Sequence, residues 1–269
     1  MKIIISHDVD HLYPSDHFLK DLIFPKLWIR SLIEFCKGEI NLQIFYYRLV
    51  SIFNKRLTCI PEIIEFDKKF AIPSVFFFGV DILLGLSYKK KASEPWIKLV
   101  LEKGFDAGVH GIEIENSKRM QKEFNDFKAI SNLNSFGIRI HYVRYNSTTF
   151  SKLADVGYLF DTSELNKKAI ELKPSYKIGK MWEFPLHIMD TYITQYKLEI
   201  TKDLTIKAIM EAEKRGLQYF TFLFHDDFFN GKTYPEKKSY YEWFVNYCRS
   251  HNYAFISYKE AIVELERNL

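Results

Sequence analysis

Residues 1–11 read Met1-Lys-Ile-Ile-Ile-Ser-His-Asp-Val-Asp-His11, an apolar run that ends in two carboxylates and two imidazoles. The β-branched residues between Lys2 and Ile5 predict a short buried strand, because such side chains suit a covered, pleated surface. On a regular strand Asp8 and Asp10 share one face. Like charges this close resist ionising together, and a bivalent metal or a proton-transfer task relieves that cost. We therefore favour a functional site here over an Asp-rich turn that caps a helix.

The composition is that of a folded protein with one sizeable core. The chain has 269 residues, of which 47% are hydrophobic and 17% aromatic, and this excludes intrinsic disorder. We expect a single α/β domain over residues 1–269, because barrels of this length commonly fold as one unit. The formal net charge is only +4, so we expect no nucleic-acid partner.

Cysteine usage and the first residues together indicate a reducing compartment. The three cysteines, Cys36, Cys59 and Cys248, are odd in number and widely spaced, which predicts no disulfide framework. The chain enters its first strand without the basic segment and apolar core of a secretory signal. We therefore predict a cytoplasmic location.

Predicted strands alternate with predicted helices along the rest of the chain. The strands or extended segments are 74–78, 106–110, 137–142, 158–161, 182–188, 219–225 and 253–256. The helices between and after them are 61–70, 95–103, 117–133, 148–156, 204–215 and 238–250. Strands joined by helical crossovers predict a parallel sheet, and the length of the chain suits a (β/α) barrel.

Several predicted strands end in side chains capable of catalysis or metal ligation. These are Asp8 and Asp10, His110, His141 with Arg144, Asp161, and His225 with Asp226 and Asp227. A single histidine at a strand end is more often structural than functional. In α/β barrels, however, the carboxyl ends of the strands converge on the active site, so this repeated pattern predicts one shared site.

Five short motifs resemble, in order, those of the polysaccharide deacetylase superfamily, also called the NodB homology or carbohydrate esterase family 4 group. They are Ser6-His-Asp-Val-Asp10, Gly108-Val-His-Gly-Ile112, Val143-Arg-Tyr145, Phe160-Asp-Thr-Ser163 and Leu223-Phe-His225. The resemblance implies a distorted (β/α) barrel that removes N- or O-acetyl groups from sugars with one divalent metal, which we expect to be zinc. The particular motifs are similar to subgroups associated with bacterial surface-polysaccharide, lipopolysaccharide or O-antigen synthesis.

The resemblance also implies a role for each matching residue. Asp8 would be the general base and His225 the general acid. Asp10 and His110 would be metal ligands. Arg144 would hold the catalytic carboxylate. The substrate would be an acetylated sugar or polysaccharide precursor.

One position departs from the family pattern. The family places a second metal-binding histidine four residues after the first, and here that position is Ile114, which cannot coordinate a metal. Four side chains remain open as substitutes: Glu113, Glu115, His7 and His11. The third motif also lacks its usual proline. A catalytically silent member that binds a glycan or a protein partner is therefore the alternative. A phosphohydrolase is disfavoured because its His-Asp pair lies on helices, whereas here the pair follows a strand.

A long insertion, at about residues 13–60, separates the first strand from the next element. Residues 25–36 and 42–53 predict two helices rich in aromatic and basic residues. Neither is long and apolar enough to span a bilayer. We expect a helical flap over the barrel mouth. The alternative is that residues 25–56 form a peripheral contact with the inner membrane or with a partner. The sequence leaves the oligomeric state open.

Overall fold

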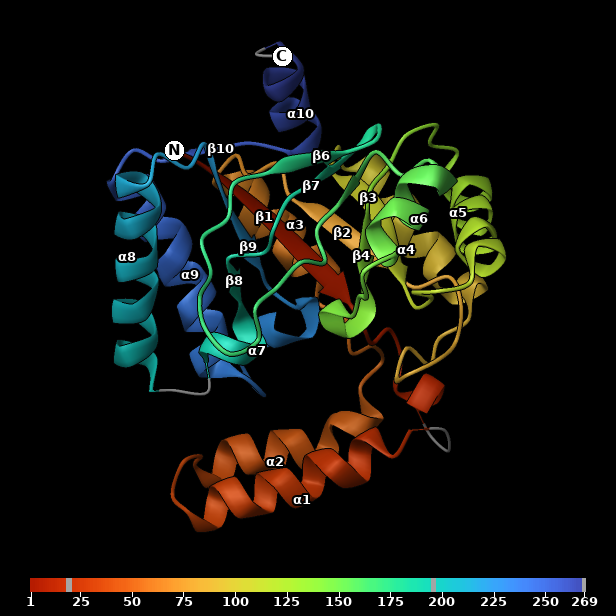
Figure 1. Cartoon of the computed structure of the whole chain (residues 1–269). Coiled ribbons are helices and arrows are strands. Elements are labelled where there is room, and N and C mark those ends of the chain that lie inside the picture. The colour runs from red at the N-terminus through yellow and green to blue at the C-terminus, as the bar shows by residue number, and fades with distance from the viewer. Residues whose placement is uncertain (18–20, 195–196, 268–269) are drawn as a thin grey trace.

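The computed structural model describes residues 1–17, 21–194 and 197–267, and its central feature is one large sheet (Figure 1). The strands of this sheet follow the order β6-β7-β5-β4-β3-β2-β1-β9-β8, with β10 paired to β1. Their bounds are β1 Lys2–Val9, β2 Val75–Phe78, β3 Asp106–Gly111, β4 Ile138–Ile140, β5 Phe160–Asp161, β6 Tyr176–Ile178, β7 Met181–Glu183, β8 Ile188–Met189, β9 Tyr219–Leu223 and β10 Ala254–Phe255.

The sheet is a curled, incomplete barrel. The strand pairs are parallel except β6 with β7, which is antiparallel, and β6 lies outside the predicted strands. Within the described residues, the end strands β6 and β8 do not pair with each other. The predicted distorted (β/α) barrel is therefore confirmed.

Helices cover the outer face of the sheet and connect its strands (Figure 1). The α-helices are α1 Ile23–Cys36, α2 Leu42–Val50, α3 Ile60–Lys69, α4 Lys90–Glu102, α5 Ser117–Ser131, α6 Thr149–Val156, α7 Asp190–Ile193, α8 Leu198–Lys214, α9 Pro235–Ser250 and α10 Tyr258–Arg267. Short 3₁₀ helices occupy Pro14–His17, Ser51–Phe53, His141–Val143 and Asp226–Phe229. The helices predicted from sequence fall on α3 to α6, α8 and α9.

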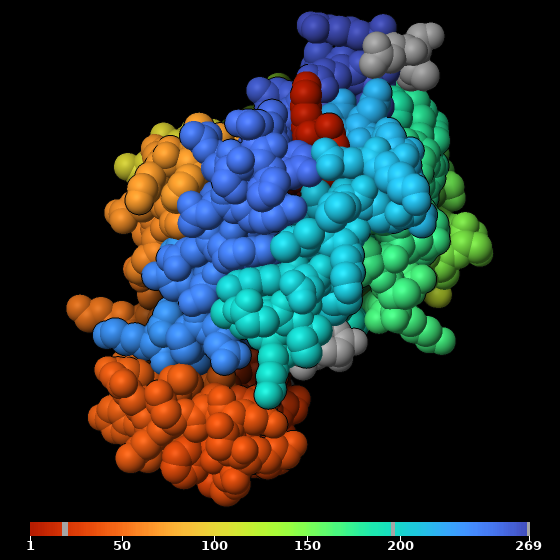
Figure 2. Space-filling view, turned by 90° about the vertical axis from the view of Figure 1, so that its left-hand side faces the viewer, coloured from red at the N-terminus to blue at the C-terminus, as the bar shows by residue number. Residues whose placement is uncertain are grey.

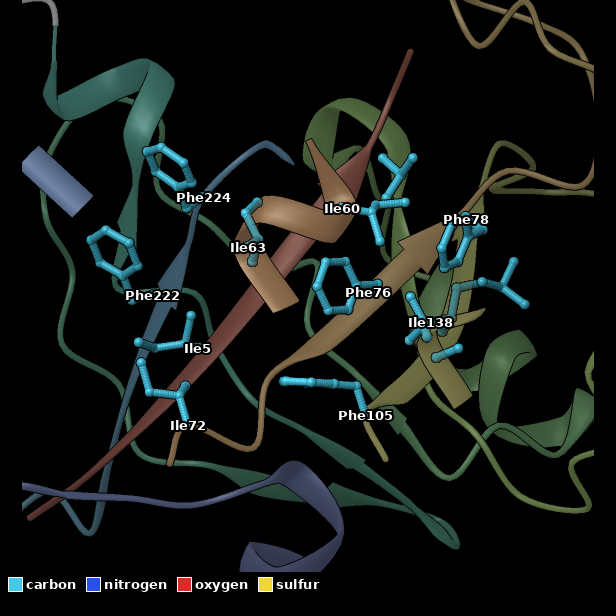
Figure 3. Packing of buried hydrophobic residues seen from close by; sticks show 14 of the residues in the cluster. Ile5, Ile60, Ile63, Ile72, Phe76, Phe78, Phe105, Ile138, Phe222 and Phe224 are labelled. Carbon is cyan, nitrogen blue, oxygen red and sulfur yellow. The ribbon is translucent and has the colours of Figure 1, made fainter. Parts of the chain in front are cut away.

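β1 lies at the centre of the sheet and divides the apolar core into two layers. Ile3 and Ile5 belong to the larger cluster, between the sheet and its covering helices, whereas Ile4 belongs to the inner cluster with Phe77. Figure 3 shows the outer layer, in which Ile5 and Phe76 lie near the helix that carries Ile60 and Ile63. The alternation along β1 therefore directs even-numbered side chains into the barrel, as period-two patterning requires.

The α1–α2 hairpin lies beyond the carboxyl end of β1, apart from the covering helices (Figure 1). In Figure 2 it forms a lobe of its own, drawn in orange, beside the rest of the molecule. Its two helices fall within the predicted insertion. Within the described part of the chain, no helix is both long and apolar enough to cross a membrane.

Candidate metal centre and active site

Asp8 and Asp10 lie at the carboxyl end of β1, where a tyrosine fixes the backbone. The hydroxyl of Tyr88 donates a hydrogen bond to the carbonyl of Val9 at 2.5 Å and accepts one from the N–H of Gly79 at 2.7 Å. Because Val9 separates the two aspartates, this contact fixes the backbone between them. Both carboxylates line the same cavity. The prediction that they share a face is confirmed.

His110 and His141 present unshared electron pairs to each other. The Nδ1–H of His110 donates to the carbonyl of Arg139 at 3.0 Å, and the Nε2–H of His141 donates to the carbonyl of Leu84 at 3.1 Å. Because a neutral imidazole carries only one N–H, each ring in the neutral form that binds a metal leaves its other nitrogen unprotonated. The remaining nitrogens, Nε2 of His110 and Nδ1 of His141, are 2.9 Å apart.

The carboxylate of Asp10 completes this cluster. Its Oδ1 is 3.2 Å from Nε2 of His110 and 3.4 Å from Nδ1 of His141, and the three ligand atoms lie within 4.8 Å of one another. Oδ1 is buried and has no hydrogen-bond partner among the described residues. Burial raises the pKa of Asp10, but the charge of His141, with a contribution from His110, holds it well below its usual range.

This donor set fits a divalent metal. Two imidazole nitrogens and one carboxylate oxygen are the ligand types of many zinc sites, and catalytic zinc is commonly held by three protein ligands. Ligand atoms at such short distances repel one another unless a positive charge, either a shared proton or a metal ion, lies between them. Asp10 and His110 were predicted as ligands. His141 was recognised at a strand end but not assigned to the metal.

Sequence analysis left open which side chain replaces the histidine missing at Ile114. The structure places none of the four candidates in the cluster. Glu113 Oε1 instead accepts hydrogen bonds from the backbone N–H groups of residues 114, 115 and 116, and so closes a turn. Glu115 is exposed and accepts a hydrogen bond from Asn146.

The two remaining histidine candidates are held elsewhere. His7 lies on the outer face of β1, where its Nδ1 donates to the carbonyl of Phe224 at 2.9 Å and its Nε2 lies 3.2 Å from Asp67. His11 lines the cavity, but its ring packs edge-on against His17, with 4.7 Å between centroids. Burial lowers the pKa of His11 to about 4, so this ring is neutral at pH 7.

The arginine that holds Asp8 is Arg139, which corrects the prediction of Arg144. Nη1 of Arg139 donates to Oδ1 of Asp8 at 2.9 Å, and its Nη2 donates to Ser6 Oγ at 2.8 Å. Arg144 instead donates to the carbonyls of Ile112 and His141. The reason is register: β4 pairs with β3 so that Arg139 points into the barrel, whereas residue 144 follows the turn after the strand.

Arg139 has a recognisable signal in the sequence. It is the only charged residue in the apolar strand Gly137-Ile-Arg-Ile-His141, and a fully buried arginine requires an acidic partner. Burial by itself raises the pKa of Asp8, but the positive charges of His110, Arg139 and His225 lower it below its ordinary value. Asp8 is therefore ionised at neutral pH.

His225 borders the cluster and is oriented by Asp190. Its Nδ1–H donates to Oδ1 of Asp190 at 2.7 Å, and its backbone N–H donates to Oδ2 at the same distance. Its Nε2 faces the cluster, 3.8 Å from Oδ2 of Asp10. Burial lowers the pKa of His225, but the charges of Asp190, Asp10 and Asp8 together raise it to about 10. Asp190 was missed, although it directly follows β8.

Two of the strand-end carboxylates, Asp161 and Asp226, are buried and hydrogen-bonded away from the cluster. Asp161 accepts a hydrogen bond from Ser163 at 2.6 Å, and burial raises its pKa although the hydrogen bonds from Glu183 and Ser163 oppose that shift. Asp226 accepts hydrogen bonds from the hydroxyl of Thr58 and the N–H of Cys59, and burial raises its pKa well above the usual value. These two residues therefore do not join the site. Asp227 does line the cavity.

The cavity has a polar floor and largely apolar walls. Its volume is about 490 Å³, within the range of small-molecule sites. The floor is formed by Asp8, Asp10, His110, His141 and His225. One wall comes from the hairpin and the other from loops of the barrel, with Phe24, Leu27, Arg30, Tyr142, Tyr192 and Phe228 among the residues involved. The insertion therefore contributes directly to the site.

This chain is similar to known proteins in its three-dimensional structure alone. No protein-family model matches the sequence, and no curated protein matches it. A protein assigned as a polysaccharide deacetylase from Mycobacterium smegmatis superimposes with a TM-score of 0.61 and 12% identity, over 99% of this chain and 90% of that one. Puue allantoinase gives 0.59 and 12%, over 96% and 87% of the two chains.

A third solved structure, a CE4 family pseudoenzyme from Bacillus anthracis, gives a TM-score of 0.51 and 8% identity. That match covers 96% of this chain and 64% of the other. Identities this low establish a shared fold and no more. The fold is therefore that of the polysaccharide deacetylases, and the resemblance predicted from the five motifs is confirmed for the fold.

Proposed function

We propose that this protein is a metal-dependent deacetylase that hydrolyses an N- or O-acetyl group on a sugar or a surface-polysaccharide precursor. The observation that carries the proposal is the convergence of Asp10, His110 and His141 beside a paired Asp8 and a paired His225. Zinc is the metal we expect, because mixed nitrogen and oxygen ligands of intermediate hardness suit it. When bound, such an ion supplies Lewis-acid polarisation of the scissile carbonyl.

Asp8 would act as the general base in this proposal. Its carboxylate is ionised, and Arg139 holds Oδ1 at 2.9 Å, so that Oδ2 remains free to accept a proton from an attacking water. Oδ2 lies 3.7 Å from Nε2 of His110, which places the acceptor beside the metal ligands. Arg139 is a positioning residue, since its guanidinium contacts Asp8 and is buried away from the cavity.

His225 would act as the general acid in this proposal. A pKa of about 10 leaves the imidazolium protonated at neutral pH. Asp190 holds Nδ1, so Nε2 is the nitrogen that can donate to the leaving amine or hydroxyl. Base and acid would therefore both border the ligand cluster, Asp8 next to His110 and His225 next to Asp10.

The shape of the cavity supports a sugar as the substrate. Tyr142, Tyr192 and Phe228 supply aromatic faces on which a pyranose ring can stack, and Asp227 supplies a carboxylate to accept its hydroxyls. The motifs similar to those of O-antigen synthesis extend the proposal to a precursor of a bacterial surface polysaccharide that is made in the cytoplasm.

Metal analysis and acetate release from acetylated sugar oligomers test this proposal together. We expect about one zinc ion per chain, and acetate release that falls by at least roughly 10²-fold in Asp8→Asn and in His225→Gln. Glu113→Gln is the matched control, because this residue closes a turn near the ligands without facing them. Undiminished release by Asp8→Asn contradicts the assignment of the base. The absence of both bound metal and acetate release would favour the silent, glycan-binding alternative.

A further inference from the structure

Helix α1 presents three different faces. One face packs against α2, where the rings of Phe35 and Phe45 stack at 5.2 Å between centroids. The second lines the cavity through Ile23, Leu27 and Arg30. The third is an apolar stripe formed by Leu22, Pro25, Ile29, Leu32, Ile33 and Cys36. Spacings of three, four and seven residues place these side chains in one row along the helix.

This apolar stripe is exposed. The exposed fractions are 61% for Leu22, 63% for Ile29, 52% for Leu32 and 50% for Ile33. No other segment of the described residues covers them. Exposed leucines scattered singly are ordinary, but a continuous apolar row on one helix marks an interaction surface. Its face is separate from the one that lines the cavity, so a partner can occupy the stripe without filling the site.

The charge of the surrounding segment indicates what kind of partner fits. Residues 22–56 contain six lysines and arginines and two glutamates, a net charge of +4 that equals the net charge of the whole chain. The remaining residues are therefore neutral in sum. Two of these cations do not face a partner, because Arg48 is buried against the barrel and Arg56 pairs with Glu62 outside the segment. The exposed lysines are those at 26, 37 and 55. Clustered positive charge beside an apolar row complements the surface of an anionic lipid bilayer.

The aromatic residues of the hairpin agree with this interpretation. Tyr46 is 57% exposed, and the amphipathic ring of tyrosine favours the boundary between lipid and water. Phe53, 84% exposed, adds an apolar ring. A second copy of the chain is a poorer partner, because a symmetric contact through this surface would bring the exposed lysines of two copies together.

We propose that the stripe on α1 docks this protein on an anionic lipid bilayer, with α1 lying in the plane of the interface. The proposal does not depend on the metal centre or on the deacetylase activity. Docking would hold the cavity, whose wall is another face of the same helix, close to the membrane surface. A sugar carried by a lipid would then reach the site without leaving the bilayer.

Vesicle co-sedimentation of the full chain tests the proposal. The probes are vesicles of phosphatidylcholine alone and vesicles that also contain phosphatidylglycerol. The test variant is Ile29→Asn with Ile33→Asn. The matched control is Ile200→Asn with Met210→Asn, which changes two apolar residues of α8 that are 48% and 60% exposed. Circular dichroism confirms that both double variants are folded, and light scattering reports the oligomeric state.

We expect the unmodified chain and the α8 variant to bind the anionic vesicles. The α1 variant should lose on the order of tenfold or more in partition, because two exposed isoleucines no longer enter the lipid. Added salt should weaken binding to anionic vesicles, and Lys37→Gln with Lys55→Gln should reduce that salt dependence.

Three results would overturn the proposal. The first is that the unmodified chain fails to bind anionic vesicles. The second is that the α1 variant binds them as well as the α8 variant does. In the third, the unmodified chain is a dimer that only the α1 variant breaks, which would assign the stripe to a second copy.

Discussion

At the scale of single residues, His141 is the side chain that joins Asp10 and His110 as the third member of the candidate metal site. It follows β4 at the start of a short turn in which Tyr142 and Val143 adopt positive φ angles of 60° and 45°. Non-glycine residues in this conformation carry strain, which persists where the surrounding structure enforces it and often marks a functional site. The turn brings the imidazole to within 2.9 Å of His110, so a ligand reaches the cluster from the adjacent strand.

Removing the His141 side chain should therefore cost metal affinity. We expect His141→Ala to weaken zinc binding by at least roughly a hundredfold, because one of three protein ligands is lost. Isothermal titration of the metal-free protein with zinc measures the change. Glu113→Gln should bind zinc like the unmodified chain. Unchanged zinc affinity in His141→Ala, with a loss in Glu113→Gln, would show that Glu113 is the third ligand.

At the scale of elements, the carboxyl end of β3 is tied to α5 by one buried acid. Oε1 of Glu123 accepts the backbone N–H of Ile112 at 2.9 Å, two residues after the ligand His110. Oε2 is buried without a hydrogen-bond partner among the described residues. Burial raises the pKa of Glu123 to about 7, so the folded protein keeps this acid neutral under mildly acidic conditions.

This raised pKa makes stability depend on pH. Below pH 4.5 Glu123 is neutral in both states. As the pH rises from about 4.5 to about 7, it ionises in the unfolded chain but not in the folded one, so its contribution to stability is lost. Glu123→Gln removes the titration and keeps an acceptor for Ile112. Relative to that of the unmodified chain, the free energy of unfolding of the variant should increase by up to about 3 kcal/mol between pH 4.5 and 8.

Urea unfolding at pH 5 and at pH 8 measures this gain. Glu115→Gln is the control, since that side chain is exposed and should give the same difference from the unmodified chain at both pH values. A Glu123→Gln variant whose relative stability does not change with pH would contradict the raised pKa.

At the scale of the whole molecule, a buried arginine joins the hairpin to the barrel. Arg48 on α2 donates through Nε to the carbonyl of Thr233 at 2.9 Å, and its guanidinium lies over the ring of Tyr234, 5.1 Å from the centroid. The same side chain pairs with Glu34 on α1. A single group therefore links α1, α2 and the loop before α9, and it holds the hairpin wall of the cavity in place.

Arg48→Met should loosen the hairpin without unfolding the barrel. Loss of a charged hydrogen-bonding group costs about 1.5–3 kcal/mol, which corresponds to amide exchange faster by roughly ten- to 150-fold. Hydrogen exchange should show that acceleration in α1 and α2 and little change in β1. Arg30→Met is the control, because Arg30 also pairs with Glu34 but is 71% exposed. Equal acceleration by both variants would contradict a linking role for Arg48.

The sequence by itself determined the elements and the direction of their side chains. Alternation along Lys2–Val9 placed Asp8 and Asp10 on one face, and the strand-end pattern placed His110 and His225 in one cavity, because period and chain direction are local properties. Only the tertiary structure decided that His141, and not residue 114, lies with Asp10 and His110 in the candidate metal site, and that Arg139, not Arg144, holds Asp8. Those choices depend on sheet register and on the turn after β4, which bring together atoms that no spacing along the chain specifies.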